Sequence, residues 1–484
     1  MNSGIRRVGA GMIVLFVALV GQLTYLQVWR AESLAEDPSN IRIFIRDIAR
    51  PRGPILTADG EIVARSLDTG DELKQQRTYP LDSLFAHVAG YQSIVYGNTG
   101  VEAAYNDELV GRDIAISLRS IDQVIRGYDP EGTVVLTLSL AAQEAARDAL
   151  RGQAGSIVVL DVRSGAVVAM YSEPTYDPNA LASHDVEEVQ AVRKILEAHP
   201  GNPELARAWR ERYPAGSTFK VITTAVALDN NVTTPDTEYP VLSEIVPPQT
   251  TRPIQNFGGK ACGGTLAESF RDSCNTTFAQ IGLDLGERFA EGVERFGINT
   301  SPPDADVNPT VVESIGPVRG AFDLDKPSFA QAAIGQGPVA VTPLEMALVA
   351  ASVANDGMMM VPHVAAEIRD ADGVVTERIE PEEWRRAMSV AAAGQLTTLM
   401  RDVVDNGTGR SAAIPGIPVA GKTGTAQAPV GANHAWFIGF APADDPVYAI
   451  AVLVEHGGEL GDDATGGRVA APMARDVLSR LLQG

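Results

Sequence analysis

An uncharged apolar stretch near the N-terminus, from Val8 to Trp29, sets the strongest limit on how this chain can fold. Its roughly 22 residues are enough for one helix to cross a bilayer. Arg6 and Arg7 precede the stretch, and positive charge favours the cytoplasmic side of a membrane. We therefore expect residues 1–7 inside and everything after the transmembrane helix outside the cytoplasmic membrane. A cleaved signal peptide fits less well, because the run is long and ends without a small-x-small cleavage site.

The charge of the chain argues against nucleic acid as a partner. Lys and Arg number 39 against 61 Asp and Glu, which gives a net charge of −22 and leaves no basic stripe to neutralise phosphates. The six histidines are scattered, and the two cysteines have no histidine near them. We expect no metal and no other cofactor.

Composition divides the extracytoplasmic part of the chain in two. The segment from Ala31 to about Pro130 is polar and rich in turns between short strand-like runs, which indicates a small N-terminal pedestal domain, with a plain linker as the alternative. We place this domain at residues 30–138 and the main domain at residues 139–484.

Apolar patterns at the two ends of the main domain predict strands. Ser156 to Leu160 and Ala166 to Tyr171 read as a hairpin, and Ala435 to Phe440 and Tyr448 to Glu455 read as two further strands. Strands at both ends with helices between them predict an α/β fold of the α+β type, in which helices flank a central antiparallel sheet and form a helical subdomain. Helical periodicity marks three segments: Ser139 to Arg151, Leu344 to Asn355 and Arg468 to Leu482.

The stretch from Tyr213 to Lys220 combines a chain break with a helix start. Pro214 and Gly216 end whatever precedes, and the apolar residues that follow recur at helical spacing, so a helix should begin at about Ser217. Lys220 then lies on the same face one turn later, where its amine can sit beside the Ser217 hydroxyl. Free N–H groups in the first turn favour negative charge. This arrangement suits a nucleophile with its base.

Two further motifs lie downstream. Ser-x-x-Lys alone is weak, because chance gives about 0.3 matches in a chain of this composition. Ser273-Cys274-Asn275 also means little alone, since such residues are common in turns. Lys422-Thr423-Gly424 is the strongest single signal, because chance supplies only about 0.03 such triplets.

Together and in this order, the three motifs resemble those of the penicillin-binding protein and serine β-lactamase superfamily. The resemblance covers most of the chain and is closest to short class B penicillin-binding proteins of the elongation or division type. Three segments resemble their pedestal motifs: Arg52 to Ile55, Arg77 to Pro80, and Gly100 to Glu102. Three others resemble their transpeptidase segments: Ala333 to Gly337, Asn406 to Gly409, and Ala435 to Pro442.

The resemblance implies acyl transfer on the D-Ala-D-Ala end of a peptidoglycan stem peptide. D-Ala would leave, and the amine of a neighbouring stem peptide would take the acyl group. Ser217 would be the nucleophile, Lys220 its base and Ser273 the proton relay. The backbone N–H groups of Ser217 and Thr425 would form the oxyanion hole. Asn275, Lys422, Thr423, Gly424 and Thr425 would bind the substrate.

The resemblance also implies partners and leaves alternatives open. β-Lactams would acylate Ser217, and a glycosyltransferase with other cell-wall synthesis proteins would be partners. The alternatives are a D,D-carboxypeptidase or β-lactamase, and a non-catalytic divisome scaffold or β-lactam sensor. A soluble hydrolase needs no membrane helix, a receptor needs more cytoplasmic chain than residues 1–7, and a scaffold does not need three intact motifs.

Cys262 and Cys274 are the two cysteines of the chain. An oxidising extracytoplasmic compartment predicts a disulfide between them, with two buried free thiols as the alternative. Closing so short a loop stabilises by roughly 3 kcal/mol at most. Because Cys274 lies between Ser273 and Asn275, the bond would brace the second motif.

Overall fold

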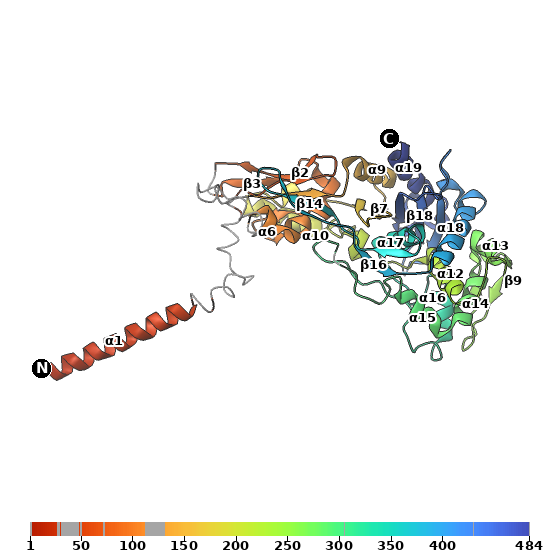
Figure 1. The fold of residues 1–484 in the computed structure, drawn as a ribbon, viewed down its shortest axis with the longest axis horizontal. Coiled ribbons are helices and arrows are strands. Elements are labelled where there is room, and N and C mark those ends of the chain that lie inside the picture. The colour runs from red at the N-terminus through yellow and green to blue at the C-terminus, as the bar shows by residue number, and fades with distance from the viewer. Residues whose placement is uncertain are drawn as a thin grey trace.

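The N-terminal helix α1 (Asn2–Thr24) stands apart from the other elements in Figure 1. Its segment Arg6–Thr24 has a mean hydropathy of 1.7 and is not buried against the protein, so it is long and apolar enough to cross a membrane. Residues 27–29 of the predicted span lie outside the described residues. The computed structural model describes residues 2–26, 30, 48, 51–70, 73–111, 131–303, 305–428 and 430–483.

A five-stranded antiparallel sheet forms the centre of the main domain, as predicted. The hairpin and the two late strands expected from the sequence all lie in it. Every residue of the interior strand β18 is buried, which requires layers on both faces of the sheet. In sheet order the strands are β17 (Ala420–Ala426), β18 (His434–Ala441), β19 (Tyr448–Val454), β7 (Gly155–Asp161) and β8 (Val167–Glu173).

Helices supply those two layers. Figure 1 shows α9 (Leu140–Leu150) and α19 (Ala470–Gln483) on one side of the sheet and α17 (Pro343–Ala354) on the other. All residues of α17 are buried, as expected for a helix in which Glu345 is the one charged residue. α18 (Val390–Asp405) packs against β17. The three predicted helices and the predicted fold class are therefore confirmed.

The helical subdomain lies beyond β17 and carries the first two motifs. Its short strand pair β9 (Glu238–Leu242) and β12 (Cys262–Thr265) is antiparallel. The helices are η4 (Gly216–Phe219), α12 (Lys220–Asp229), α13 (Leu266–Arg271), α14 (Asn275–Leu285), α15 (Glu287–Glu294) and α16 (Lys326–Ala332). Two earlier helices lie outside this subdomain: α10 (Val186–Ala198) lies beside the N-terminal part in Figure 1, and α11 (Arg207–Arg210) packs against β7, β8 and α17. Smaller elements here are β10 (Glu244–Ile245), β11 (Ile254–Gln255) and η5 (Phe257–Gly259).

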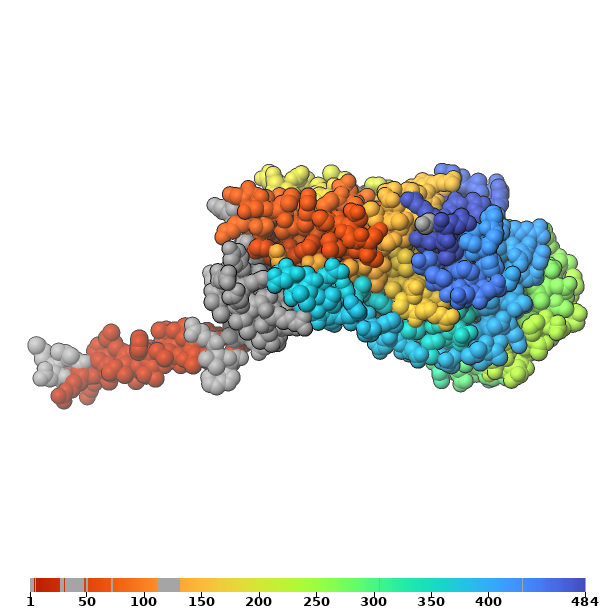
Figure 2. All heavy atoms as spheres, turned by 45° about the horizontal axis from the view of Figure 1, so that its top comes forward, coloured from red at the N-terminus to blue at the C-terminus, as the bar shows by residue number. Residues whose placement is uncertain are grey.

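A second, six-stranded sheet forms the N-terminal part, and its composition departs from the sequence expectation. The sheet contains strands from both sides of the boundary predicted between residues 138 and 139, because β14 and β15 come from the C-terminal part and β14 pairs antiparallel with β6. β14 satisfies backbone groups of β6 that would otherwise form an open edge. Figure 2 shows this later chain, in cyan, against the orange N-terminal part. In sheet order the strands are β15 (Val375–Arg378), β14 (Ala365–Arg369), β6 (Thr133–Leu136), β1 (Ile55–Leu56), β2 (Ile62–Asp68) and β3 (Gln75–Thr78).

A buried ion cluster joins the three motifs of the N-terminal part. Arg52 Nε and Arg77 Nε each lie 2.5 Å from a different carboxylate oxygen of Glu102, and all three side chains are buried. Burial raises the pKa of Glu102, but the two guanidinium groups outweigh this effect and bring the pKa below its ordinary value. Neighbouring elements are η2 (Asp82–Phe85), α4 (Ala86–Ala89), β4 (Gln92–Ser93), β5 (Gly97–Asn98), α5 (Gly100–Ala104) and α6 (Asn106–Leu109).

Candidate active site

Ser217 lies in the first helical turn after a sharp chain reversal. The turn is the 3₁₀ helix η4, which runs directly into α12, so the helix begins within a residue of the predicted position. Gly216 has a φ of +54°, and a Cβ there would meet the carbonyl oxygen of Thr425 at 2.8 Å. Only glycine therefore fits at this turn. Ser217 is half-buried while the residues on both sides of it are buried, so it is the most exposed residue of η4.

Lys220 is fully buried, and its amine makes three hydrogen bonds. Nζ donates to the carbonyl oxygen of Ser273 at 2.8 Å, to Ser273 Oγ at 3.2 Å and to Asn275 Oδ1 at 2.8 Å. Within the described chain, no hydrogen bond joins Lys220 to Ser217 Oγ, although their spacing in the sequence places them on the same helix face. All three acceptors belong to the second motif.

The second motif has an unusual backbone that is held from several sides. Ser273 has a φ of +63°, a conformation that costs a non-glycine residue roughly 1 kcal/mol or more. Cys274 follows it, donates its N–H to the carbonyl oxygen of Ser269 at 2.8 Å, and forms a disulfide with Cys262 across a Cα distance of 5.4 Å. Asn275 Nδ2 donates to the carbonyl oxygen of Gln255 at 2.8 Å. These contacts fix Ser273 in its strained conformation.

The third motif lies on the edge strand β17, beside η4. Lys422 is fully buried, and its Nζ donates to Ser273 Oγ at 2.9 Å and to the carbonyl oxygen of Thr423 at 3.1 Å. A Cβ on Gly424 would lie 3.0 Å from the carbonyl oxygen of Ala215, so glycine allows β17 to approach the turn before Ser217. Thr425 Oγ1 accepts from the N–H of Gly466 at 3.4 Å.

Two buried lysines therefore converge on one hydroxyl. No carboxylate hydrogen-bonds to either amine among the residues that the structure describes. Burial and the charge of Lys422 lower the pKa of Lys220 well below 10.5, and burial lowers the pKa of Lys422 to about 7. The remaining near contacts are aromatic: Lys220 Nζ lies 5.3 Å from the ring centre of Phe278, and Lys422 Nζ lies 5.7 Å from that of Phe270. A neutral lysine has a lone pair that can accept a proton from a hydroxyl.

Several supporting residues could not be identified as such from the sequence. Gly335 accepts from the N–H of Gly216 at 2.8 Å, and a Cβ on Gly335 would meet the Gly216 carbonyl oxygen at 2.0 Å. Thr408 Oγ1 lies 2.6 Å from Thr423 Oγ1. Both belong to segments noted for their resemblance, but that resemblance gave them no role. Gln255 lay in no noted segment, and it accepts from Asn275 through its backbone carbonyl, which depends on no particular side chain.

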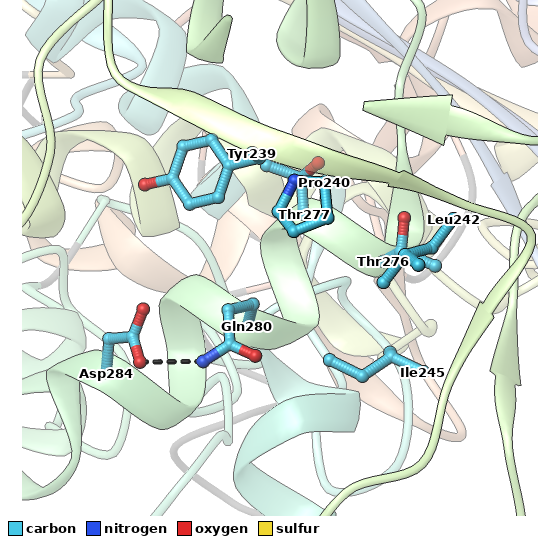
Figure 3. Close-up of a pocket in the computed structure, with 8 residues that line it drawn as sticks. All are labelled: Tyr239, Pro240, Leu242, Ile245, Thr276, Thr277, Gln280 and Asp284. Atoms are coloured by element: carbon cyan, nitrogen blue, oxygen red, sulfur yellow. Dashed lines mark hydrogen bonds between the residues drawn. The ribbon is translucent and has the colours of Figure 1, made fainter. Parts of the chain in front are cut away.

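A cavity of about 220 Å³ lies next to the second motif, between the β9–β10 segment and α14 (Figure 3). One wall is largely apolar and the α14 wall is polar, where Gln280 donates to Asp284 at 2.7 Å. None of the residues predicted for catalysis or binding lines this cavity. The lining residues are Tyr239, Pro240, Leu242, Ile245, Thr276, Thr277, Gln280 and Asp284.

Comparison with known proteins connects this geometry to one family. The penicillin binding protein transpeptidase domain matches residues 155–479, and the penicillin binding protein A dimerisation domain matches residues 52–135. Peptidoglycan D,D-transpeptidase PbpA of Mycolicibacterium smegmatis is 38% identical over 499 residues, which cover 100% of this chain and 99% of that protein. PbpA of Mycobacterium tuberculosis strain H37Rv is 36% identical over 500 residues, which cover 100% of both chains.

Solved structures of penicillin-binding proteins match the fold of this chain. Penicillin-binding protein A from M. tuberculosis as a ceftriaxone acyl-enzyme complex matches with a TM-score of 0.84 and 35% identity, over 91% of this chain and 100% of that one. Its penicillin G acyl-enzyme complex matches with a TM-score of 0.82 and 36% identity, over 90% and 100%. Sequence, domain composition and fold all lead to one assignment, and the chain belongs to the class B penicillin-binding proteins.

Proposed function

We propose that this protein is a peptidoglycan D,D-transpeptidase that acts through an acyl-enzyme on Ser217. The observation that supports this most directly is the convergence of Lys220 and Lys422 on Ser273 Oγ. Lys220 itself lies one helical turn after Ser217. Two buried amines that share a neutral partner favour loss of a proton from one of them. The lysine that loses it then serves as the base that an unactivated serine needs.

In the first half of the reaction, neutral Lys220 takes the proton of Ser217 as Oγ attacks the carbonyl carbon of the penultimate D-Ala. Negative charge develops on the carbonyl oxygen, where the N–H groups of Ser217 and Thr425 stabilise it. The C–N bond then breaks. Lys220 returns its proton through the Ser273 hydroxyl to the leaving amine, and D-Ala departs. Ser217 is left as an ester.

In the second half, the amine of another stem peptide attacks the ester carbon. Its proton passes to Lys220, the C–O bond breaks and Ser217 recovers its hydrogen. The new amide joins two stem peptides. Hydrolysis would follow the same steps with water, so the outcome depends on which nucleophile is held at high effective concentration.

Substrate binding falls to the remaining motif residues. Lys422 in its charged form, with the hydroxyls of Thr423 and Thr425, supplies donors for the terminal carboxylate of the donor peptide. Gly424 lets the substrate backbone lie along β17. Asn275 has a second Nδ2 hydrogen, beside the one donated to Gln255, for a substrate amide oxygen.

The proposed setting is the outer face of the cytoplasmic membrane. α1 anchors the chain, residues 1–7 remain inside, residues 30–138 form the pedestal and residues 139–484 carry the transpeptidase. This tether confines the site to the layer where nascent strands emerge and supports transfer to an amine rather than to water. A glycosyltransferase that supplies those strands, with other cell-wall synthesis proteins, completes the proposal.

The test uses full-length protein in detergent. Exposure to penicillin should give one covalent adduct per chain on Ser217 by mass spectrometry, and Ser217→Ala should give none. With nascent polymeric peptidoglycan the protein should produce cross-linked dimeric stem peptides. An adduct that survives in Ser217→Ala contradicts the site, and trimmed monomers alone contradict the transpeptidase assignment in favour of a D,D-carboxypeptidase.

A further inference from the structure

The tyrosine four positions before Ser217 takes part in a buried network that the proposed mechanism does not use. Tyr213 OH donates to Glu455 Oε1 at 2.6 Å, and Arg207 Nε donates to the same oxygen at 2.8 Å. Tyr213 and Arg207 are 5% and 4% exposed, and the side chain of Glu455 is 14% exposed. Glu455 directly follows β19, whereas Arg207 begins α11. The carboxylate thus ties the segment before the nucleophile to the central sheet.

The backbone of the same segment is held on the opposite, helical side. Tyr213 exchanges two backbone hydrogen bonds with Val341, both of 2.9 Å, and the N–H of Gly216 donates to Gly335 at 2.8 Å. Val341 and Gly335 lie in the connection between α16 and α17. On the sheet side, besides the Glu455 contact, the carbonyl oxygen of Pro214 accepts from Trp436 Nε1 at 3.0 Å.

The ring of Tyr213 also rests on the sheet. It meets the rings of His434 and Trp436 edge to face, with centroid distances of 5.4 and 6.3 Å. These ring contacts restrict the tyrosine, and the hydroxyl fixes its far end to a charged acceptor. Hydrogen bonds to charged groups are the stronger ones.

Arg207 holds Glu455 in turn. Its other nitrogens donate to the carbonyl oxygens of Gly201 at 2.5 Å and Asn202 at 3.2 Å. The guanidinium is therefore committed to the protein, and it orients the carboxylate toward Tyr213.

We propose that Glu455 is a positioning residue for catalysis, which acts through the Tyr213 hydroxyl to fix Ser217 Oγ relative to β17. The inference rests on the proposed role of Ser217 as the nucleophile. A displacement of about 1 Å at a reacting atom can cost roughly a hundredfold in rate. Tyr213 lies only four residues before Ser217, so release of its hydroxyl from Glu455 would allow Ser217 Oγ to move by a distance of this order.

A matched pair exists elsewhere in the chain. Tyr171 OH donates to Glu173 Oε2 at the same distance of 2.6 Å, and Tyr171 is 3% exposed. Both residues belong to β8, so their bond ties no other segment in place. Tyr171→Phe therefore removes the same kind of hydrogen bond without touching the segment before Ser217.

The experiment compares Tyr213→Phe with Tyr171→Phe in the full-length protein. Acylation by a fluorescent penicillin is followed at several concentrations, which separates the saturating rate constant from the dissociation constant. We expect Tyr213→Phe to lower the saturating rate constant about tenfold or more, with an unchanged dissociation constant and one adduct per chain at completion. Tyr171→Phe should acylate like the wild type, although both variants lose a similar amount of thermal stability.

Two results would overturn the inference. The first is a saturating rate constant for Tyr213→Phe within about twofold of the wild type. The second comes from a double-mutant cycle that combines Tyr213→Phe with Glu455→Gln. We expect the double variant to acylate no more slowly than the slower single variant, because both substitutions break the same Tyr213–Glu455 hydrogen bond. Multiplied losses would show that Glu455 does not act through Tyr213. A wild-type adduct on a residue other than Ser217 would instead overturn the proposed function, and this inference with it.

Discussion

The N-terminal part and the active site each bury a cluster of charged side chains, and they treat that charge in opposite ways. In the N-terminal part, Arg52 and Arg77 share Glu102, so the buried cations have a counter-ion. In the active site, Lys220 and Lys422 share only the hydroxyl of Ser273. The first cluster remains ionised. In the second cluster, burial lowers the pKa of both lysines.

This difference distinguishes a cluster that stabilises the fold from one that takes part in the reaction. A buried ion pair is expensive to break, because the remaining partner keeps an uncompensated charge. A buried amine without a counter-ion has a lowered pKa, which places a base at neutral pH. The partner of a buried charge, rather than its burial, therefore indicates whether it holds the fold or performs the reaction.

The largest expected effect is on Lys220. Lys220→Ala should lower the rate of penicillin acylation by about a thousandfold or more, because the base is lost. Lys220→Arg should be equally inactive, since a guanidinium cannot lose its proton in a protein. Circular dichroism should show both variants folded. Acylation of either variant at a rate near that of the wild type would make Lys220 merely structural.

The N-terminal cluster should show the reverse pattern. Glu102→Gln leaves two buried guanidinium groups without a counter-ion and should cost about 3–5 kcal/mol of stability. Denaturant unfolding measures this, while the acylation rate of the folded protein should not change. The exposed pair Arg401–Asp444, at 2.7 Å, provides the control, because Asp444→Asn should cost at most about 1 kcal/mol. Equal losses in the two variants would contradict the comparison.

Glu345 offers a third case, a buried acid. Its Oε1 has no hydrogen-bond partner among the described residues, and burial raises its pKa to about 8 from an ordinary 4.5. Its stabilising contribution is complete below pH 4.5 and is lost as the pH rises through 8. Glu345→Gln removes this dependence, so the variant should gain about 2 kcal/mol over the wild type between pH 6 and pH 8. A stability difference that is constant across this range would show that Glu345 titrates normally.

The smallest effect concerns Lys422. Its pKa of about 7 means that the charge is present below pH 7 and is lost above it. Penicillin affinity should therefore fall by up to about tenfold per pH unit above pH 7, as the cation that faces the carboxylate disappears. Lys422→Arg keeps its charge, so its affinity for penicillin should not change as the pH rises above 7. The same alkaline fall in Lys422→Arg would assign that titration to another group.

Local sequence signals predicted most of the fold and the site. The β-rich runs that predicted β7 and β8, the apolar strands β18 and β19 and the predominantly apolar helix α17 are local properties. The three motifs were found for the same reason. The pairing of β14 with β6, the choice of Ser273 rather than Ser217 as the partner of Lys220, and the Tyr213–Glu455 contact join residues far apart in the chain. Only packing of the whole chain decides them, so no local pattern could reveal them.

The strand exchange between the two parts of the molecule has a mechanical consequence. Thr137, which follows β6, donates backbone and side-chain hydrogen bonds to carbonyl oxygens of the segment that leads into β14. The chain therefore crosses between the pedestal and the catalytic lobe more than once, and a single hinge residue cannot let one lobe swing on the other.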